Sequence, residues 1–79
     1  MQSPARYLVI IESAGAMVAR LFDARHGHLS DFDASSEEVA VMTAGIAPAH
    51  GVEGSEWGLA MDGHSPAERA AALVFALEL

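Results

Sequence analysis

The strongest hydrophobic pattern lies near the start of the chain, in residues 6–12 (RYLVIIE). β-Branched and aromatic side chains of this kind favour a strand. Apolar residues occupy both odd and even positions, so both faces of the strand are expected to be covered. The pattern therefore predicts a strand inside a sheet, which residues 13–15 (SAG) then interrupt.

Residues 16–24 (AMVARLFDA) fit two patterns. Their apolar positions recur at helical spacing, and they also alternate as in a strand. The neighbourhood favours the strand, because the break at 13–15 suits a hairpin turn and a second turn at 25–27 precedes strand-like residues 28–32. We expect a meander of three strands, with a helix over 16–24 as the alternative.

A capping box marks the start of a first helix. Ser35 is expected as the N-cap and Glu38 as the third helical residue, whose side chain returns the hydrogen bond. The helix is expected to close near Gly45 and Pro48, and residues 47–54 are typical of a loop. Its inner face is expected to consist of Val39, Met42, Thr43 and Ile46.

A second capping box, Ser65 with Glu68, has Pro66 at the favoured first helical position and predicts a short helix through Ala72. Residues 73–79 (LVFALEL) carry large apolar side chains at odd positions, which predicts a strand. A continued helix is the alternative.

Residues 56–62 (EWGLAMD) are ambiguous as well. Alternation favours a strand, whereas Ser55 as a cap and Gly63 as a stop favour a short helix. We expect the helix.

Together these elements predict an α+β fold, with an antiparallel sheet of about four strands and two or three short helices on one face. The 79 residues are expected to form one domain, 1–79, whose C-terminal strand returns beside the first. Such a sheet leaves its other face open, and in an apolar chain that face suits a homodimer contact.

Composition supports self-association. Hydrophobic residues make up 52% of the chain, although 16 residues are alanine, and a domain of this size hides only about 60% of its unfolded surface. The large apolar residues concentrate in 7–11 and 73–79, two terminal strands that must pair with each other or with a second copy. The interface candidates are Trp57, Phe75, Leu77 and Leu79.

The net charge is −7, with four arginines and no lysine. A phosphate backbone would be repelled, so no nucleic-acid partner is expected, whereas a basic protein surface is a suitable partner. The absence of cysteine excludes a disulfide and a thiol nucleophile. No signal peptide is visible, and the longest run without charge or histidine, 39–49, is too short for a membrane span. We expect a cytoplasmic protein without membrane contact.

Candidate chemistry is sparse. His26 and His28 stand beside Asp31 and Asp33 as nitrogen and oxygen ligands of a metal would, but in an extended strand His28 points away from both aspartates. A shared ion would need a bulge, and a polar turn followed by a charged edge strand is the simpler interpretation.

Asp62, His64 and Ser65 have the residue types of a hydrolase triad. Triads are assembled in space rather than from sequence neighbours, and Ser65 is occupied as an N-cap. We therefore predict no catalytic residue, no metal and no cofactor.

Three blocks carry a resemblance: residues 32–35 (FDAS), 37–40 (EEVA) and 63–70 (GHSPAERA). They resemble a family of small uncharacterised bacterial proteins. The resemblance implies no activity and only a bacterial cytoplasmic setting.

Three hypotheses for function follow. The first is a non-enzymatic protein that acts through protein–protein contact and self-associates. The second is an acidic inhibitor or immunity-type binder of a basic partner, which would gather the carboxylates of Glu37, Glu38, Glu53 and Glu56 on one face. The third is a small enzyme or ligand-binding domain that uses Glu12, His50 or His64.

Overall fold

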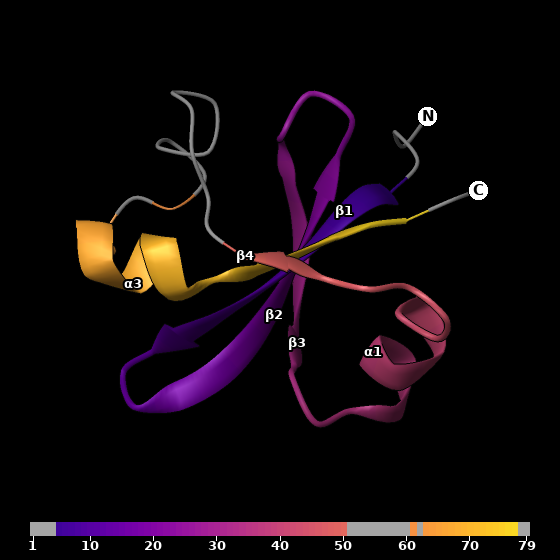
Figure 1. Ribbon diagram of the computed structural model, residues 1–79, viewed down its shortest axis with the longest axis horizontal. Helices are drawn as coiled ribbons and strands as arrows, with labels where there is room; N and C mark the ends of the chain where they lie inside the picture. Colours follow the sequence, from indigo (N-terminus) through magenta and orange to yellow (C-terminus); the bar gives the residue numbers. More distant parts are fainter. Residues whose placement is uncertain (1–4, 51–60, 62, 78–79) are drawn as a thin grey trace.

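The computed structural model describes residues 5–50, 61 and 63–77, which form an antiparallel sheet with two short helices (Figure 1). The sheet has five strands in the order β3-β2-β1-β5-β4. Its strands are β1 (Ala5–Ser13), β2 (Ala16–Asp23), β3 (His28–Asp33), β4 (Ala49–His50) and β5 (Leu73–Ala76). The helices are α1 (Glu37–Met42) and α3 (Pro66–Ala71). The α+β class and the antiparallel sheet predicted from the sequence are confirmed.

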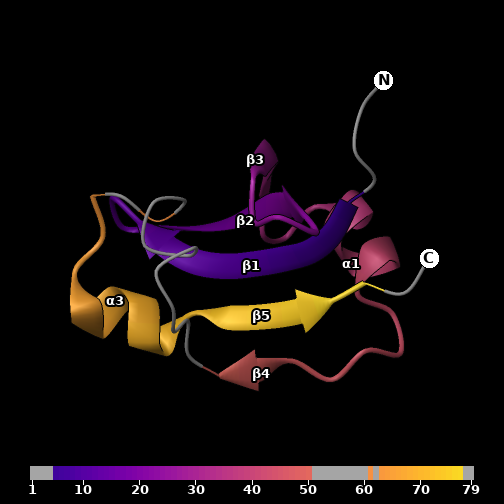
Figure 2. The same ribbon diagram turned by 90° about the horizontal axis from the view of Figure 1, so that it is seen from above.

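β1 is the central strand, with β2 on one side and β5 on the other (Figure 2). Consecutive residues of β1 are buried on opposite faces of the sheet: Leu8 and Val9 are both 0% exposed. The prediction that apolarity at odd and even positions marks an inner strand is therefore confirmed.

The ambiguous segment 16–24 is a strand, β2, so the predicted three-strand meander is confirmed. A two-residue turn joins β1 to β2, because Ser13 pairs with Ala16 across the end of the hairpin. Ala14 has φ 52° and Gly15 has φ 81°. Two positive φ angles characterise a type I′ turn, whose twist matches that of the flanking strands.

The end of the chain returns to the sheet as β5, which pairs with β1 from Tyr7↔Ala76 to Ile10↔Leu73. The backbone N–H of Leu77 also donates to the carbonyl of Arg6 at 2.8 Å. The predicted terminal strand beside the first strand is confirmed. The two terminal segments therefore hydrogen-bond to each other within one chain.

β4 corrects the interpretation of residues 47–54 as loop. Ala49 pairs with Val74, and His50 pairs with Leu73. Two residues of pairing cover part of the outer edge of β5, a long-range contact that no local sequence signal announces.

The second capping box forms as predicted. The Ser65 hydroxyl oxygen accepts from the N–H of Glu68 at 3.1 Å, and the N–H of Ser65 donates to Glu68 Oε1 at 2.8 Å. The helix that follows ends at Ala71, and Ala72 turns to extended backbone with ψ 146°.

The first helix begins one residue later than predicted. Ser36, not Ser35, is the N-cap, and its hydroxyl oxygen accepts from the N–H of Val39 at 3.4 Å. Ser35 is held by Asp33, to which its N–H donates at 2.9 Å and its hydroxyl at 2.6 Å. Ser35, which the sequence pattern predicts as the N-cap, is thus part of the turn at Asp33.

Both helices lie on the sheet face that carries Leu8. Val39 of α1 joins a buried cluster there. Ala67 and Ala71 of α3 line a hollow together with Glu12, farther along that face of β1. The members of this cluster are Leu8, Ala19, Val39, Phe75 and Leu77.

The opposite face is not open, which corrects the basis for the predicted homodimer contact. Val9, Ile11 and Phe22 lie on it and are at most 1% exposed. Met61 and Ala72 pack into the same cluster. The ambiguous segment 56–62 falls almost wholly outside the described residues.

Replacement of Ala14 by asparagine is expected to stabilise the fold. Alanine is unfavourable at positive φ, whereas asparagine tolerates it, and the difference is about 1 kcal/mol. For a domain of this size that gain raises the melting temperature by about 4–8 °C, measurable by circular dichroism. Ala24→Asn, in the next turn but without a positive φ, is the control and should change it little. Equal effects of the two substitutions would contradict the strained turn.

Candidate functional site

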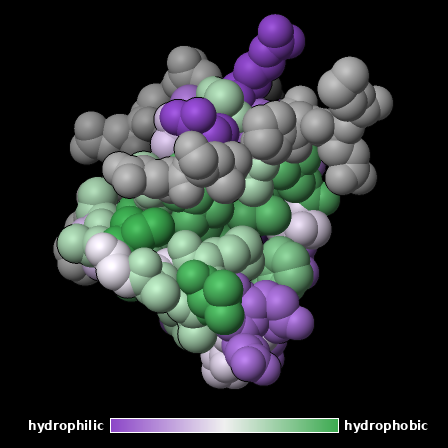
Figure 3. All heavy atoms as spheres, turned by 90° about the vertical axis from the view of Figure 1, so that its right-hand side faces the viewer, coloured by the Kyte–Doolittle hydropathy of each residue, from purple (hydrophilic) through white to green (hydrophobic). Residues whose placement is uncertain are grey.

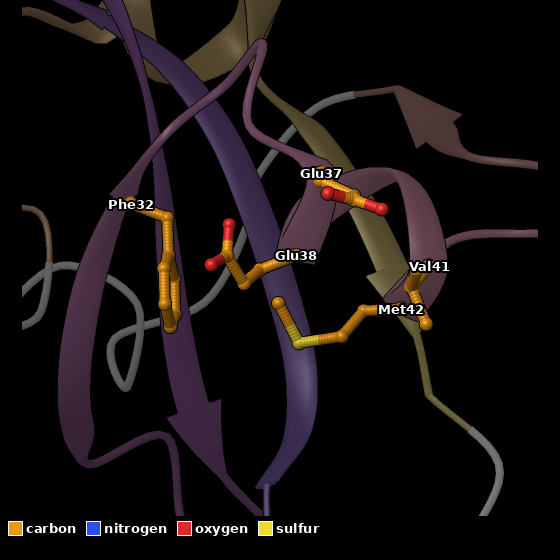
Figure 4. A pocket seen from close by; sticks show the side chains of 5 residues that line it. All are labelled: Phe32, Glu37, Glu38, Val41 and Met42. Carbon is orange, nitrogen blue, oxygen red and sulfur yellow. The ribbon is translucent and has the colours of Figure 1, made fainter.

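A groove between β3 and α1 is the best candidate for a site. It has a volume of about 440 Å³. Three apolar and two acidic side chains line it: Phe32, Glu37, Glu38, Val41 and Met42. Figure 4 shows Phe32 projecting from β3 and Met42 reaching toward it from α1, with the carboxylate of Glu38 between them.

Helical spacing explains which side chains of α1 reach the groove. Glu37 and Val41 are four residues apart, as are Glu38 and Met42, so the two pairs form one stripe. Val39, only 3% exposed, points instead into the core and fixes the orientation of the helix. Because Val39 is buried, the helix is rotated so that this stripe faces the groove.

Val41 is the most exposed large apolar residue of the described chain, at 70%. The surrounding surface is also apolar: in Figure 3, hydrophobic residues gather on the side of the molecule to which α1 belongs, and hydrophilic residues border them. An apolar side chain left in water at the mouth of a groove marks a place where another molecule gains by binding.

Acidity is the second property of the groove. Within the described residues, the carboxylates of Glu37 and Glu38 take part in no ion pair or side-chain hydrogen bond. Their negative charges lie in the first turn of α1, where the helix dipole favours them. Both carboxylates therefore remain available to a cation or to a donor from a partner.

The neighbouring edge strand holds a polar cluster centred on Asp31. His28 Nε2 lies 2.6 Å from Asp31 Oδ1, and Arg20 Nε lies 3.7 Å from the same oxygen. The register of β2 and β3 shifts after Leu21, and this irregularity brings His28 to the side of Asp31. The bulge that a metal site shared by His28 and Asp31 would need is present. The third side chain beside them, however, is that of Arg20, a cation, and not a metal ligand.

The described residues contain no group of three or more histidine or acidic side chains arranged to hold a metal ion. Asp33 is engaged as well, because hydrogen bonds from the hydroxyl and the N–H of Ser35 lower the pKa of its carboxyl. The polar residues of β3 are thus bound to one another or to the turn that follows.

The triad-like residues do not form a nucleophilic site. Ser65 caps α3, and its partner is Glu68. His64, whose side chain is 7% exposed, places Nδ1 3.9 Å from Glu68 Oε2. Asp62 lies outside the described residues.

The three residues of the enzyme hypothesis do not line one pocket among the described residues. Glu12 is exposed and lines a smaller hollow of about 290 Å³ with Glu68, and His64 is not among the described residues that line it. His50 belongs to β4 at the far edge of the sheet.

Two interface candidates lie in the core of the molecule. Phe75 and Leu77 are each 7% exposed and pack in the cluster of Leu8 and Val39. Trp57 and Leu79 fall outside the described residues.

Sequence reasoning missed Phe32 and Val41 as site residues. Met42 was expected on the inner face of the helix, and it does pack partly against the core while it lines the groove. One feature of the sequence could have indicated the groove. Val41 is an apolar residue outside the predicted inner face of the helix, and it follows a glutamate by four residues.

No family model, curated protein or solved structure matches the chain. The resemblance of residues 32–35, 37–40 and 63–70 to small bacterial proteins stays a prediction. Among the helices described, none has the length and apolar character needed to cross a membrane.

The capping box at Ser65 gives a prediction about acid stability. Hydrogen bonds from Ser65, with its backbone N–H first, lower the pKa of Glu68 below its ordinary value of 4.5. The stabilisation of the fold by the ionised carboxylate of Glu68 is therefore complete above about pH 4.5. It is lost as the pH falls through the lower pKa that Glu68 has in the folded state. Glu68→Gln keeps a hydrogen-bond acceptor but does not titrate.

The melting temperature of the wild type is expected to exceed that of Glu68→Gln at neutral pH, and the difference should shrink as the pH falls below about 4.5. Thermal denaturation followed by circular dichroism measures both. A difference that stays constant down to about pH 3 would show that the charge of Glu68 does not stabilise the cap.

Proposed function

We propose that the protein acts without catalysis, by holding a basic segment of another protein in the groove between β3 and α1. The observation that carries the proposal is the composition of that groove: Val41 is exposed at its mouth, and the carboxylates of Glu37 and Glu38 are unpaired among the described residues. The net charge of −7 favours basic partners over acidic ones.

Apolar contact and charge have different tasks in this proposal. Burial of Val41 and of the ring of Phe32 contributes about 25 cal/mol for each Å² removed from water. The exposed carboxylates add little affinity, about 0–1 kcal/mol for each ion pair, but they accelerate encounter and select a basic partner. Binding is therefore expected to weaken as salt increases.

This proposal joins the first two hypotheses from the sequence. An inhibitor or immunity-type binder would need its carboxylates on one face, and Glu37 and Glu38 do share the groove. Glu53 and Glu56 lie outside the described residues.

Self-association is the second candidate. One observation favours it: Met17, Leu29 and Val41 are exposed by 50%, 38% and 70%. The terminal strands no longer require a second copy, because β1 and β5 pair within the chain. A dimer would have to use the remaining exposed apolar side chains.

Binding in the groove is tested by affinity capture from cells that produce the protein. Val41→Ser is expected to reduce the captured partner about five-fold or more, because it removes apolar contact without burying a polar group. Met17→Ser, at an exposed apolar position of β2, is the matched control and should retain capture. Capture that is equal for both variants, or absent from the wild type, would contradict the proposal.

Self-association is tested by sedimentation velocity at micromolar concentration. If two copies join through the exposed apolar residues, the mass is expected to be about twice 8.3 kDa, and Val41→Asp should restore the monomer. A mass of 8.3 kDa over the whole concentration range would exclude the homodimer.

A further inference from the structure

Among the strands that the structure describes, β3 is an outer one, and no described strand pairs with its second edge. Backbone groups of alternate residues point to opposite sides of a strand. The N–H of Ala34 donates to the carbonyl of Met17 at 3.3 Å, which fixes the phase of the alternation. Phe32 and Ala34 therefore turn their backbone groups toward β2, whereas the N–H and carbonyl of Asp31 and the N–H of Asp33 face the open edge.

The side chains of β3 alternate as well. Phe32 pairs with Ala19 on the sheet face that α1 covers, and its ring lines the groove. Asp31 and Asp33 pair with Arg20 and Val18 and project from the opposite face. The open edge thus has an apolar groove on one side and carboxylates on the other.

We propose that this edge binds an extended segment of a basic protein as a sixth strand, with apolar side chains alternating with arginine or lysine. The segment would hydrogen-bond to the outward backbone groups of Asp31 and Asp33. Its apolar side chains would enter the groove beside Phe32, and its cations would face the aspartates. The inference rests on the proposed function and specifies the conformation of the partner.

Charge favours a basic segment over a second copy of this chain. In the described residues, the edge and the groove carry four carboxylates. One of them, that of Asp31, contacts Arg20 and His28, and no ion pair joins the other three to a described residue. The four are those of Asp31, Asp33, Glu37 and Glu38. Pairing of β3 with its own copy would bring aspartates against aspartates, which destabilises a strand pair. A basic segment removes that repulsion.

The other edge of the sheet is a poorer template. In the part of the chain that the structure describes, β4 consists of Ala49 and His50, whereas β3 has six residues, from His28 to Asp33. A groove with unpaired carboxylates adjoins β3. The geometry therefore selects β3.

The probe is a labelled heptapeptide of alternating arginine and valine, titrated into the full chain and followed by fluorescence anisotropy. In the wild type, amide exchange of Asp31 and Asp33 is expected to slow about ten-fold or more when the peptide is bound, because their N–H groups become hydrogen-bonded. The amide of Phe32, which already faces β2, should change little. Binding without protection of the Asp31 and Asp33 amides would overturn strand addition.

Asp31→Pro removes the outward N–H without removing a hydrogen bond to β2. It is expected to weaken peptide binding about ten-fold. Asp31→Ala is the matched control, because it loses the same carboxylate but keeps the N–H, and should weaken binding about three-fold at most. Equal losses would overturn the proposal, and circular dichroism shows whether each variant is folded.

A second probe separates this inference from the proposed function. It is a helical peptide of lysine, leucine and alanine with an apolar face. If it binds in a manner that depends on Val41 and the extended peptide does not bind, the groove holds a helix and strand addition fails. If neither peptide binds, both proposals fail.

Discussion

The pairing of the two ends of the chain is the contact on which the other elements depend. β5 comes last in the sequence and pairs with β1, the first strand, so β1 becomes an inner strand with neighbours on both sides. Leu8 and Val9 are then buried on opposite faces, each contributing about 2 kcal/mol or somewhat more. The total stability of a chain of this size is expected to be only a few times larger than the contribution of one such residue. The pairing of β5 with β1 is therefore needed for the two hydrophobic clusters to form.

Local signals in the sequence predicted much of this arrangement. The uniform apolarity of residues 7–11 indicated a strand covered on both faces, and Ser65 with Glu68 indicated the start of α3. The interpretation failed where two local patterns competed for one residue, as at Ser35, which Asp33 holds in a turn while Ser36 caps the helix. It also failed where a long-range contact decides the structure, as in the short strand β4.

The candidate site was harder to predict than the fold because it depends on orientation. No sequence pattern singles out Phe32 or Val41. They line one groove because α1 starts at its N-cap Ser36, shortly after β3, and because the buried Val39 sets the rotation of the helix. Conversely, the histidine and aspartate cluster that drew attention in sequence does form a contact, between His28 and Asp31, but Arg20 completes it. A cluster of metal-ligand residue types thus has a structural role when a cation from a neighbouring strand joins it.

Adjacency of the ends has a consequence for the order in which the chain can be connected. Tyr7 and Ala76 are paired neighbours, so a short linker from the end of β5 to the start of β1 would join the two strands without crossing the sheet. New termini opened at the exposed Ala14–Gly15 turn would keep all five strands and the continuous stretch from β3 to α1. Such a circular permutant turns the strand pairing that now closes the fold into a local hairpin, and so changes the order of folding while leaving the groove intact.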